Sequence, residues 1–452
     1  MSRFTVAFFS PAWSLAMALL AVTLCAGPAR GQFGLLFSAA GPVNRGMGGV
    51  GVATANDAIG ALYWNPATIS DLGGTQAALG VELLHPQSRL ASTFAAGSLG
   101  PGVPFVPLSG SDRADNGTFP LPSGALVYQT ADSPWTFGIA AFEVGGFGVN
   151  YPASTTNPVL TPQPPRGVGL GSVFSRLEVL EIAPAVSCRL TENLAVAVGP
   201  TLDLADLQVD PLFIAPPDDA NGDGFPTFPG GTHTRWQWGG GVQGGVYYAS
   251  EGGWRMGASV KSPRWFETFR FQSTDELGRP RTFTFGADLP MVISLGSAYA
   301  GFNRWLLGAD LHYIDFRDAK GLGESGFTPD GAARGVGQHS IWAFAAGAEY
   351  RLTDMLSLRL GYAFSQNPID ALHVSANVAS PTIVQHTLSV GASCRVSDCL
   401  RLDVAYVHGF QNSATGPLVT PLGVVPGTAI TSVVSADTFA VGATLRFGAT
   451  CD

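Results

Sequence analysis

Residues Gly41 to Gly74 have the sequence GPVNRGMGGVGVATANDAIGALYWNPATISDLGG, which is too irregular to predict a strand or a helix. Four glycines between Gly46 and Val52 let the backbone turn at positive φ and approach another chain closely. A dinucleotide-binding fingerprint built on these glycines would need a preceding strand and a following helix, and the sequence indicates neither. As a surface loop, the stretch would leave Tyr63 and Trp64 in water. We therefore expect it to be a plug that the rest of the chain surrounds.

The first 31 residues have the parts of a secretory signal peptide. Arg3 precedes an apolar run from Phe4 to Cys25, and the small residues around Ala29 suit a cleavage site, which would place the mature N-terminus at Gln32. A membrane anchor is the alternative, and Pro11 within the run disfavours it. Export from the cytoplasm is therefore expected.

The composition narrows the class of protein. Charged residues make up 13% of the 452 residues, hydrophobic residues make up 46%, and there are 58 glycines. About 25% of an ordinary soluble domain is charged. Beyond the signal peptide, no apolar run reaches the roughly 18 residues that a transmembrane helix needs. A barrel is the other structure that satisfies its own backbone hydrogen bonds in a bilayer. The net charge of -9 disfavours nucleic acid, because its binders need a basic surface.

Alternation with a period of two residues supports the barrel. From Leu356 to Phe364, leucine and aromatic residues alternate with polar or small ones, and the pattern recurs at Phe439–Phe447, Leu400–Tyr406 and Trp305–Tyr313. A soluble sandwich would turn the apolar face inward, whereas a membrane barrel turns it outward. The signal peptide, the low charge and the aromatic residues near the strand ends favour the membrane barrel.

Several charged residues fall on the polar face of these strands, namely Glu349, Arg351, Arg359, Arg401 and Asp403. In a membrane barrel this face lines the lumen. Because an unpaired arginine is costly there, we expect the arginines to pair with the acids across neighbouring strands.

Turn segments suggest the topology. Cys188–Leu194, Tyr350–Leu356 and Cys394–Leu400 are similar short segments that predict hairpin turns on the periplasmic rim. The longer segments Tyr151–Ser172, Asp210–His233 and Gln411–Ser435 suit extracellular loops. Fourteen strands fit between these marks, with expected starts near Thr75, Leu121, Trp135, Phe174, Leu194, Thr234, Trp254, Thr282, Arg304, Ser340, Met355, Thr382, Leu400 and Thr438.

The plug sequence resembles the hatch of the FadL/TodX family, outer-membrane transporters of long-chain fatty acids and other hydrophobic molecules. Arg45-Gly46, the run Ala55–Ala58 and Asn65-Pro66-Ala67 fill, in order, the places of that family's hatch motif. The resemblance implies an all-β fold, a fourteen-stranded antiparallel transmembrane β-barrel plugged by an N-terminal hatch. The expected organisation is a signal peptide at 1–31, the hatch at 32–74, the barrel at 75–448 and a C-terminal tail at 449–452.

The resemblance also implies a function. A monomer in the bacterial outer membrane, without a cofactor, would pass long-chain fatty acids or similar lipids and hydrocarbons by passive diffusion. In the family the start of the hatch reaches the ligand pocket, which here implies Phe33, Leu35, Leu36 and Phe37; simple packing against the wall is the alternative.

A kinked third strand opens the wall sideways in the family, and Trp135–Tyr151 takes that place here. The resemblance thus implies a lateral gate toward outer-membrane lipid at Gly145, Gly146, Phe147 and Gly148, since glycines are where a strand bulges or breaks. A bend in the wall without a gate is the alternative.

Four cysteines remain after cleavage. Cys394 and Cys399 flank one tight turn, where antiparallel strands bring Cβ atoms within bridging range, so we expect a disulfide between them. Two free thiols are the alternative, and the sequence does not decide the state of Cys188 and Cys451. No histidine lies at ligand spacing from the pair, so no metal site is expected.

Motifs for catalysis are absent from the sequence. Neither HExxH nor GxSxG occurs, and the seven histidines are scattered. We therefore expect that the protein is not an enzyme. The alternative is a catalytic Ser-His pair assembled across neighbouring strands. The segment from Asp219 to Asp223 copies half of a calcium loop but lacks the closing glutamate, which favours an acidic turn over a bound ion. A docking or shuttle barrel for secreted proteins, like the PorV-type proteins, is a further alternative function.

Overall fold

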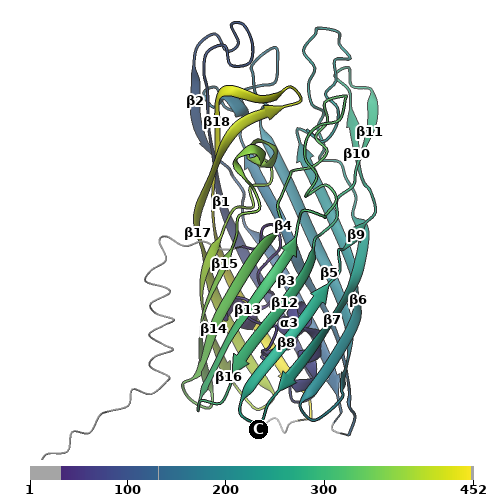
Figure 1. The fold of residues 1–452 in the computed structure, drawn as a ribbon, viewed down its shortest axis with the longest axis vertical. Coiled ribbons are helices and arrows are strands. Elements are labelled where there is room, and N and C mark those ends of the chain that lie inside the picture. The colour runs from purple at the N-terminus through teal and green to yellow at the C-terminus, as the bar shows by residue number, and fades with distance from the viewer. Residues whose placement is uncertain (1–31, 131, 449–452) are drawn as a thin grey trace, which may run out of the picture.

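The computed structural model describes residues 32–130 and 132–448, which form a closed antiparallel barrel of fourteen strands (Figure 1). Each barrel strand pairs with the next, and β18 pairs with β1 to close the ring. The predicted fold class is confirmed. The expected signal peptide and the tail at 449–452 lie outside the described residues. The barrel strands are β1 (Gln76–Phe94), β3 (Phe119–Gln129), β4 (Trp135–Tyr151), β5 (Val173–Arg189), β6 (Leu194–Asp210), β7 (Gln237–Ala249), β8 (Trp254–Lys261), β12 (Met291–Tyr299), β13 (Trp305–Asp315), β14 (Ile341–Arg351), β15 (Leu356–Ser365), β16 (His386–Arg395), β17 (Leu400–Thr420) and β18 (Gly423–Arg446).

Short strands decorate the barrel. β2 (Leu108–Arg113) pairs with the far end of β1, and β9 (Trp265–Phe266) pairs with β7. β10 (Phe269–Thr274) and β11 (Pro280–Phe285) form a separate hairpin. The expected strand start near Thr282 is therefore wrong, because Thr282 lies in that hairpin and the eighth barrel strand begins at Met291.

The last hairpin is much longer than the sequence predicts. β17 has 21 residues and β18 has 24, so the expected loop at Gln411–Ser435 is strand on both sides of one turn. In Figure 1 this hairpin (yellow) stands beside β2 at the upper end of the molecule. Outside the bilayer a strand has no lipid-facing side, so the apolar alternation used for the prediction fades although the pairing continues.

The two faces of the strands point as predicted. On β15, Leu358 and Leu360 are 42% and 54% exposed, whereas Arg359 between them is only 6% exposed. The apolar face is therefore the outer one and the charged face lines the lumen. Most exposed large apolar side chains of the membrane strands belong to this outer surface, as a lipid-facing band requires.

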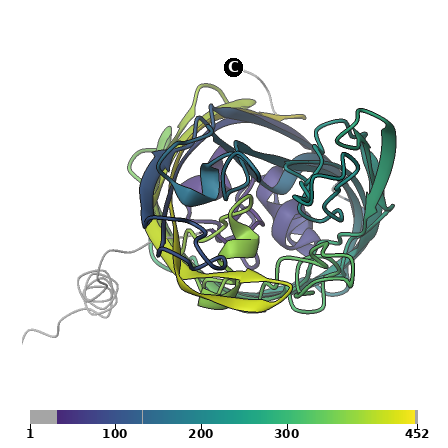
Figure 2. The ribbon, with the colours of Figure 1, turned by 90° about the horizontal axis from the view of Figure 1, so that it is seen from above.

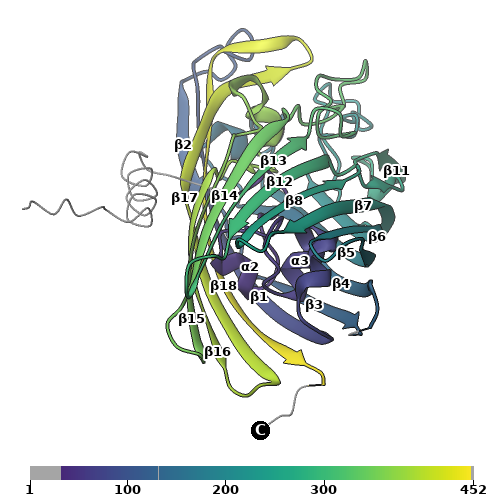
Figure 3. The ribbon, with the colours of Figure 1, turned by 60° about the horizontal axis from the view of Figure 1, so that its bottom comes forward.

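The plug lies inside the barrel, as Figures 2 and 3 show. It contains two short helices, α2 (Pro42–Gly46) and α3 (Ala58–Trp64), followed by the 3-10 turn η1 (Pro66–Asp71), so the expectation of a stretch without helix is wrong. The Asp57 carboxylate accepts a hydrogen bond from the backbone of Gly60 at 2.7 Å and so caps α3. No helix among the described residues is long and apolar enough to cross a membrane.

An inward-folded segment closes the lumen from the other side. We call residues 366–385, between β15 and β16, the lumen loop; it includes η3 (Ala371–His373) and η4 (Ser375–Asn377). Figure 2 shows this light green segment within the ring of strands. Most of its apolar side chains are buried, including Ile369, Val374, Val378 and Ile383, whereas Leu372 is exposed. A further 3-10 turn, η2 (Pro158–Leu160), lies between β4 and β5.

Candidate functional site

Asn65 joins the plug to the wall. Its side-chain amide donates to the carbonyl of Val52 in the plug at 2.8 Å and to that of Val246 on β7 at 3.0 Å. Its Oδ1 accepts from the backbone of Ala67 at 3.1 Å and so caps η1. Pro66, without an N–H, occupies the first position of that turn. Asn65, Pro66 and Ala67 thus form one buried hydrogen-bonded unit.

A second anchor joins α2 to β1. The Nε of Arg45 lies 2.6 Å from Oε2 of Glu82, and the other oxygen of Glu82 accepts from the backbone of Gly41 at 2.7 Å. Both side chains of the pair are buried. Gly46, beside Arg45, packs against the backbone of Gly391, where a Cβ would lie 3.1 Å from the Cα of Gly391. Glu82 is not among the predicted site residues, although an acid among the apolar residues of a predicted strand is a sequence signal for a residue that faces the lumen.

A third anchor comes from β13. One oxygen of Asp310 accepts from the backbone N–H groups of Gly51 and Val52 at 2.7 and 2.9 Å. These are two of the plug's backbone groups that the irregular conformation would otherwise leave unpaired. The carboxylate therefore replaces the hydrogen bonds that regular secondary structure would provide.

Glycines of the wall make room for the plug. A Cβ on Gly257 would lie 2.0 Å from the carbonyl oxygen of Val52, and one on Gly245 would lie 2.0 Å from Oδ1 of Asn65. The same holds at Gly361, where a Cβ would lie 2.1 Å from the plug backbone. Isolated glycines inside predicted strands are the sequence signal for such close approach.

The predicted lumen charges meet near the periplasmic end. Arg359 lies 2.7 Å from Glu349 and 4.0 Å from Asp403, and Arg401 lies 3.0 Å from Asp403. Among the described residues, Arg351 makes no ion pair with either acid and is exposed at the end of β14. Four of the five predicted residues therefore form one cluster. Arg401 also donates to the plug backbone at Asn56, at 3.3 Å, so the cluster supports the plug from below.

A second buried charge cluster, which the sequence analysis missed, lies beside α3. Glu181 on β5 accepts from Lys261 at 2.6 Å and from Arg264 at 3.0 Å. The ammonium group of Lys261 lies 5.1 Å from the ring centre of Tyr63 and 5.6 Å from that of Phe142. Glu181 is 80 residues away from Lys261 in the sequence, so no local motif could have indicated the cluster.

The start of the hatch pairs with β4. The N–H of Phe37 donates to the carbonyl of Val144 at 3.0 Å, and the N–H of Gly146 donates to the carbonyl of Leu35 at 2.9 Å. The hydroxyl of Tyr63 reaches the carbonyl of Phe37 as well. Residues 35–37 therefore act as a short extra strand on the inner side of β4.

Beside this contact the wall is incompletely paired. The ladder between β3 and β4 runs from Gln129 and Thr136 only as far as Ser123 and Phe142, and β4 continues to Tyr151 without β3. Against β5, the register of β4 shifts between Glu143 and Gly145, so β4 bulges next to the predicted glycines.

Two prolines of β3 explain why this strand does not pair with the outer part of β4. β3 contains Pro120 and Pro122 just beyond the last residue that pairs with β4, while its ladder with β1 continues through both. Proline has no N–H to donate, so it is tolerated where one side of a strand lacks a partner. Neither proline is among the predicted site residues, although the sequence shows the two prolines at a spacing of two residues, on one face of a strand.

A cavity of about 70 Å³ lies at this place. It is lined from β1, β3, β4, β5, β18 and the lumen loop, and its lining includes Leu121, Phe147, Leu177, Glu143 and Glu178. Of the four residues predicted to line the ligand pocket, only Phe37 borders this cavity. Phe33, Leu35 and Leu36 are buried in the core instead; Leu35 and Leu36 are held there by backbone pairing with β4, and Phe33 by pairing with Leu36.

The expected disulfide between Cys394 and Cys399 is wrong. Cys394 is free and exposed on the outer face, whereas Cys399 is buried and disulfide-bonded. Cys394 stands opposite Leu402 in the ladder, so the two cysteines are not cross-strand partners. Cys188 is free, and Cys451 lies outside the described residues.

The acidic segment of the long loop between β6 and β7 forms local turns. Oδ1 of Asn221 accepts from the backbone of Asp223 at 2.8 Å, and Oδ1 of Asp219 accepts from Gly224 at 3.2 Å. These bonds agree with an acidic turn, and ion binding there stays an untested alternative.

Comparison with known proteins supports the family resemblance in the barrel part of the chain. Residues 244–447 match the family described as outer membrane protein transport protein (OMPP1/FadL/TodX). The fold is similar to crystal structures of a Pseudomonas aeruginosa FadL homologue (18% identity, 92% of this chain and 100% of that chain, TM-score 0.69), the Ralstonia pickettii toluene transporter TbuX (20%, 91% and 99%, 0.63) and the P. putida toluene transporter TodX (17%, 91% and 100%, 0.64). Comparison with curated proteins finds no match. The predicted resemblance to this family is confirmed over residues 244–447, and an outer-membrane location agrees with the family match and with the fold.

Proposed function

Because residues 244–447 match the OMPP1/FadL/TodX family and the barrel has the fold of solved FadL-type structures, we propose that this chain carries hydrophobic small molecules across the outer membrane by passive diffusion. The ligand enters from the extracellular side, passes the cavity between β3 and β4, and leaves sideways into outer-membrane lipid. One chain contains the whole path, so a monomer suffices.

The observation that carries this proposal is the coincidence of the cavity with the interrupted ladder. The cavity borders Phe119 to Leu121 of β3 and Gly146 to Gly148 of β4, and these are the stretches that do not pair with each other. A hydrophobic molecule there has lipid beyond the wall. At the periplasmic end, by contrast, it would meet arginines and acids before reaching water.

The lining also bears on the class of ligand. Glu143 and Glu178 border the cavity, and among the described lining residues there is no lysine or arginine. A fatty-acid carboxylate would find no positively charged partner in this lining, whereas a neutral hydrocarbon needs none. Neutral hydrocarbons are therefore the favoured ligands, with fatty acids as the alternative, and Glu143→Gln should improve uptake of a fatty acid more than uptake of toluene.

The experiment that tests this proposal restores the backbone N–H donors that the two prolines of β3 lack. Pro120→Ala combined with Pro122→Ala gives β3 two N–H groups with which to pair to β4, and should slow toluene uptake by cells while raising the melting temperature of the barrel. The control is Pro200→Ala on β6, an exposed strand proline that does not line the cavity. Replacing Gly145 and Gly146 by valine is a poorer test, because Cβ atoms there would lie 2.7 and 2.4 Å from backbone oxygens. Unchanged uptake in the well-folded double proline variant would place the exit elsewhere.

A docking barrel is the second candidate. The loop between β1 and β2 exposes Phe105 (88%) and Val106 (55%), and Leu422 at the turn of the last hairpin is 100% exposed. Exposed apolar groups at the extracellular tip are what a platform for secreted proteins would present. Phe105→Ser with Leu422→Ser should leave toluene uptake unchanged under the transport proposal, and loss of a surface-retained protein in that variant would favour docking.

A further inference from the structure

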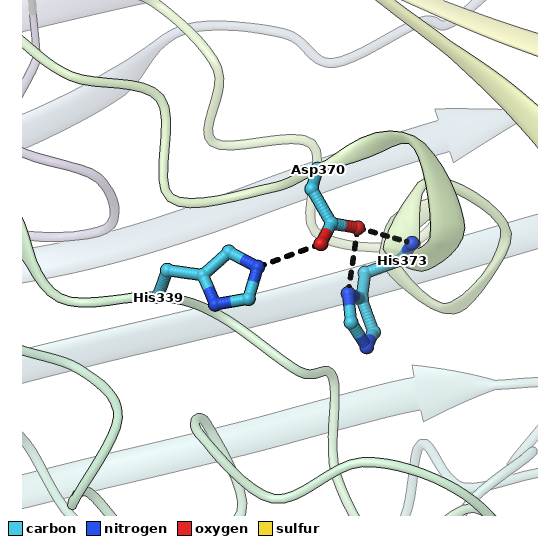
Figure 4. A group of neighbouring side chains, drawn as sticks. All are labelled: His339, Asp370 and His373. Atoms are coloured by element: carbon cyan, nitrogen blue, oxygen red, sulfur yellow. Dashed lines mark hydrogen bonds and ion pairs between the residues drawn. The ribbon is translucent and has the colours of Figure 1, made fainter.

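Three side chains that can bind a metal ion lie together at the lumen loop, which contributes two of them. His339, at the end of the loop between β13 and β14, lies with its Nε2 2.7 Å from Oδ2 of Asp370, and Nδ1 of His373 lies 2.7 Å from Oδ1 of the same carboxylate. Figure 4 shows both imidazoles directed at Asp370. The three ligand atoms all lie within 4.8 Å of one another.

Local structure holds each of the three in place. The Asp370 carboxylate caps η3 through the backbone N–H groups of Leu372 and His373, which fixes the acid relative to the second histidine. The backbone of His339 donates to the carbonyl of Pro368 at 2.8 Å, which fixes the first histidine relative to the lumen loop. Gly337 gives the ring of His373 its room, since a Cβ there would lie 2.1 Å from the ring.

The donor set has the chemistry of a transition-metal site. Two imidazole nitrogens and one carboxylate oxygen are the ligands that Zn²⁺ takes in sites with an open position, at distances of about 2.0–2.2 Å. Around such an ion neighbouring ligand atoms stand about 3.3 Å apart, so the two nitrogen–oxygen distances need to lengthen by roughly 0.6 Å. The side chains of His339, Asp370 and His373 are 52%, 42% and 22% exposed, so His339 and Asp370 can make this adjustment at the surface while His373 keeps its place.

The charge of the Asp370 side chain also favours a metal ion at this place. Both imidazoles direct a nitrogen at the Asp370 carboxylate, and a carboxylate is the anionic partner that a metal ion takes beside two neutral imidazoles. A cation placed between the histidines replaces the protons that now bridge them to the carboxylate.

We propose that His339, Asp370 and His373 form a binding site for a divalent transition-metal ion, of which Zn²⁺ is the representative, that clamps the lumen loop to the loop between β13 and β14. The two loops already touch below the site, where the side-chain amide of Asn377 donates to the carbonyl of Val336 at 2.7 Å. A bound ion adds a second, stronger connection at the surface.

The clamp acts on the segment that covers the passage. The lumen loop accepts a hydrogen bond from Gln32, the first described residue of the plug, at the carbonyl of Val384 (2.8 Å), and Pro381 and Thr382 line the cavity. Metal binding therefore restrains the extracellular cover of the cavity. Its effect on uptake rests on the proposed function, whereas metal binding and loop restraint do not.

The experiment uses the mature protein in detergent, stripped with EDTA and titrated with ZnCl₂ by calorimetry. We expect saturable binding of one Zn²⁺ per chain, and loss of one of three protein ligands in His373→Ala or in Asp370→Asn should weaken it by at least about tenfold. His233→Ala, which removes an exposed histidine from the loop between β6 and β7, is the matched control and should bind as the wild type.

Hydrogen exchange distinguishes a clamp from a simple surface site. Zn²⁺ should slow amide exchange in peptides covering 366–385 in the wild type and in His233→Ala, and leave it unchanged in His373→Ala. Binding that survives in both His373→Ala and Asp370→Asn overturns the site, and tight binding without slower exchange in the lumen loop overturns the clamp. Toluene uptake with and without Zn²⁺ is measured separately, so a failure of the transport proposal leaves the binding result intact.

Discussion

Removing the side-chain amide of Asn65 is the most direct test of how the plug is held. Asn65→Ala loses two donated hydrogen bonds and one accepted hydrogen bond, all in a fully buried place, and it leaves the carbonyls of Val52 and Val246 without that donor. At about 1 kcal/mol for each net hydrogen bond, the change should destabilise the seated plug by about 3 kcal/mol. That corresponds to a roughly 100-fold larger opening equilibrium of the plug.

The effect should reach the ligand passage. Asn65 directly follows α3, whose Tyr63 hydroxyl contacts the carbonyl of Phe37, and Phe37 pairs with β4 and lines the cavity. A looser α3 therefore loosens residues 35–37 beside the interrupted ladder. The barrel strands pair with one another and should keep their melting temperature, while hydrocarbon uptake falls.

Hydrogen exchange by mass spectrometry measures the prediction, with peptides of the plug compared against peptides of β13 to β18. The matched control is Asn56→Ala, in the same plug, because the amide nitrogen of Asn56 has no hydrogen-bond partner among the described residues. Plug exchange should accelerate about 100-fold in Asn65→Ala if it follows the opening equilibrium, and hardly at all in Asn56→Ala. Equal exchange in the two variants would refute the assignment of Asn65 as the anchor.

Three further predictions concern the wall. Gly257→Ala, whose new methyl group meets the plug backbone, should displace the plug and admit ions in planar-bilayer recordings, whereas Gly244→Ala on the outer face of β7 should stay closed. Glu82→Ala leaves a buried arginine of the plug without its partner and should cost about 3–5 kcal/mol, visible as faster exchange in α2 and disproved by wild-type exchange there. A lipid-soluble quencher should reach a fluorophore attached at Leu358 but not one at Arg359, and equal quenching would mean that the strand faces are reversed.

The sequence predicted the barrel because its physical signature is local. Alternation along Leu356–Phe364 follows from a wall with lipid on one side, and a single strand carries that information. The apolar alternation stops where β18 leaves the bilayer, so the sequence predicts a loop for the outer part of this strand. The start near Thr282 failed for the opposite reason, since β10 and β11 alternate without belonging to the wall.

The site was only partly predictable. Asn65 and Arg45 stand in a recognisable motif, but their partners on β7 and β1 are fixed by the closure of the barrel. Three isolated residues, Glu82, Asp310 and Glu181, carry no motif, and only the fold brings each to its partners. His339 and Asp370 likewise come from different loops, which explains why the histidines looked scattered in the sequence.

The height of the last hairpin has a practical consequence. With 24 residues, β18 rises about 60 Å along the barrel at about 3.3 Å per residue and an ordinary tilt, whereas the apolar band of such barrels is about 25 Å tall. The turn at Leu422 therefore stands well clear of the outer leaflet and is within reach of antibodies or bacteriophage added to intact cells. A peptide epitope inserted at this turn would allow the protein to be counted and tracked on living bacteria.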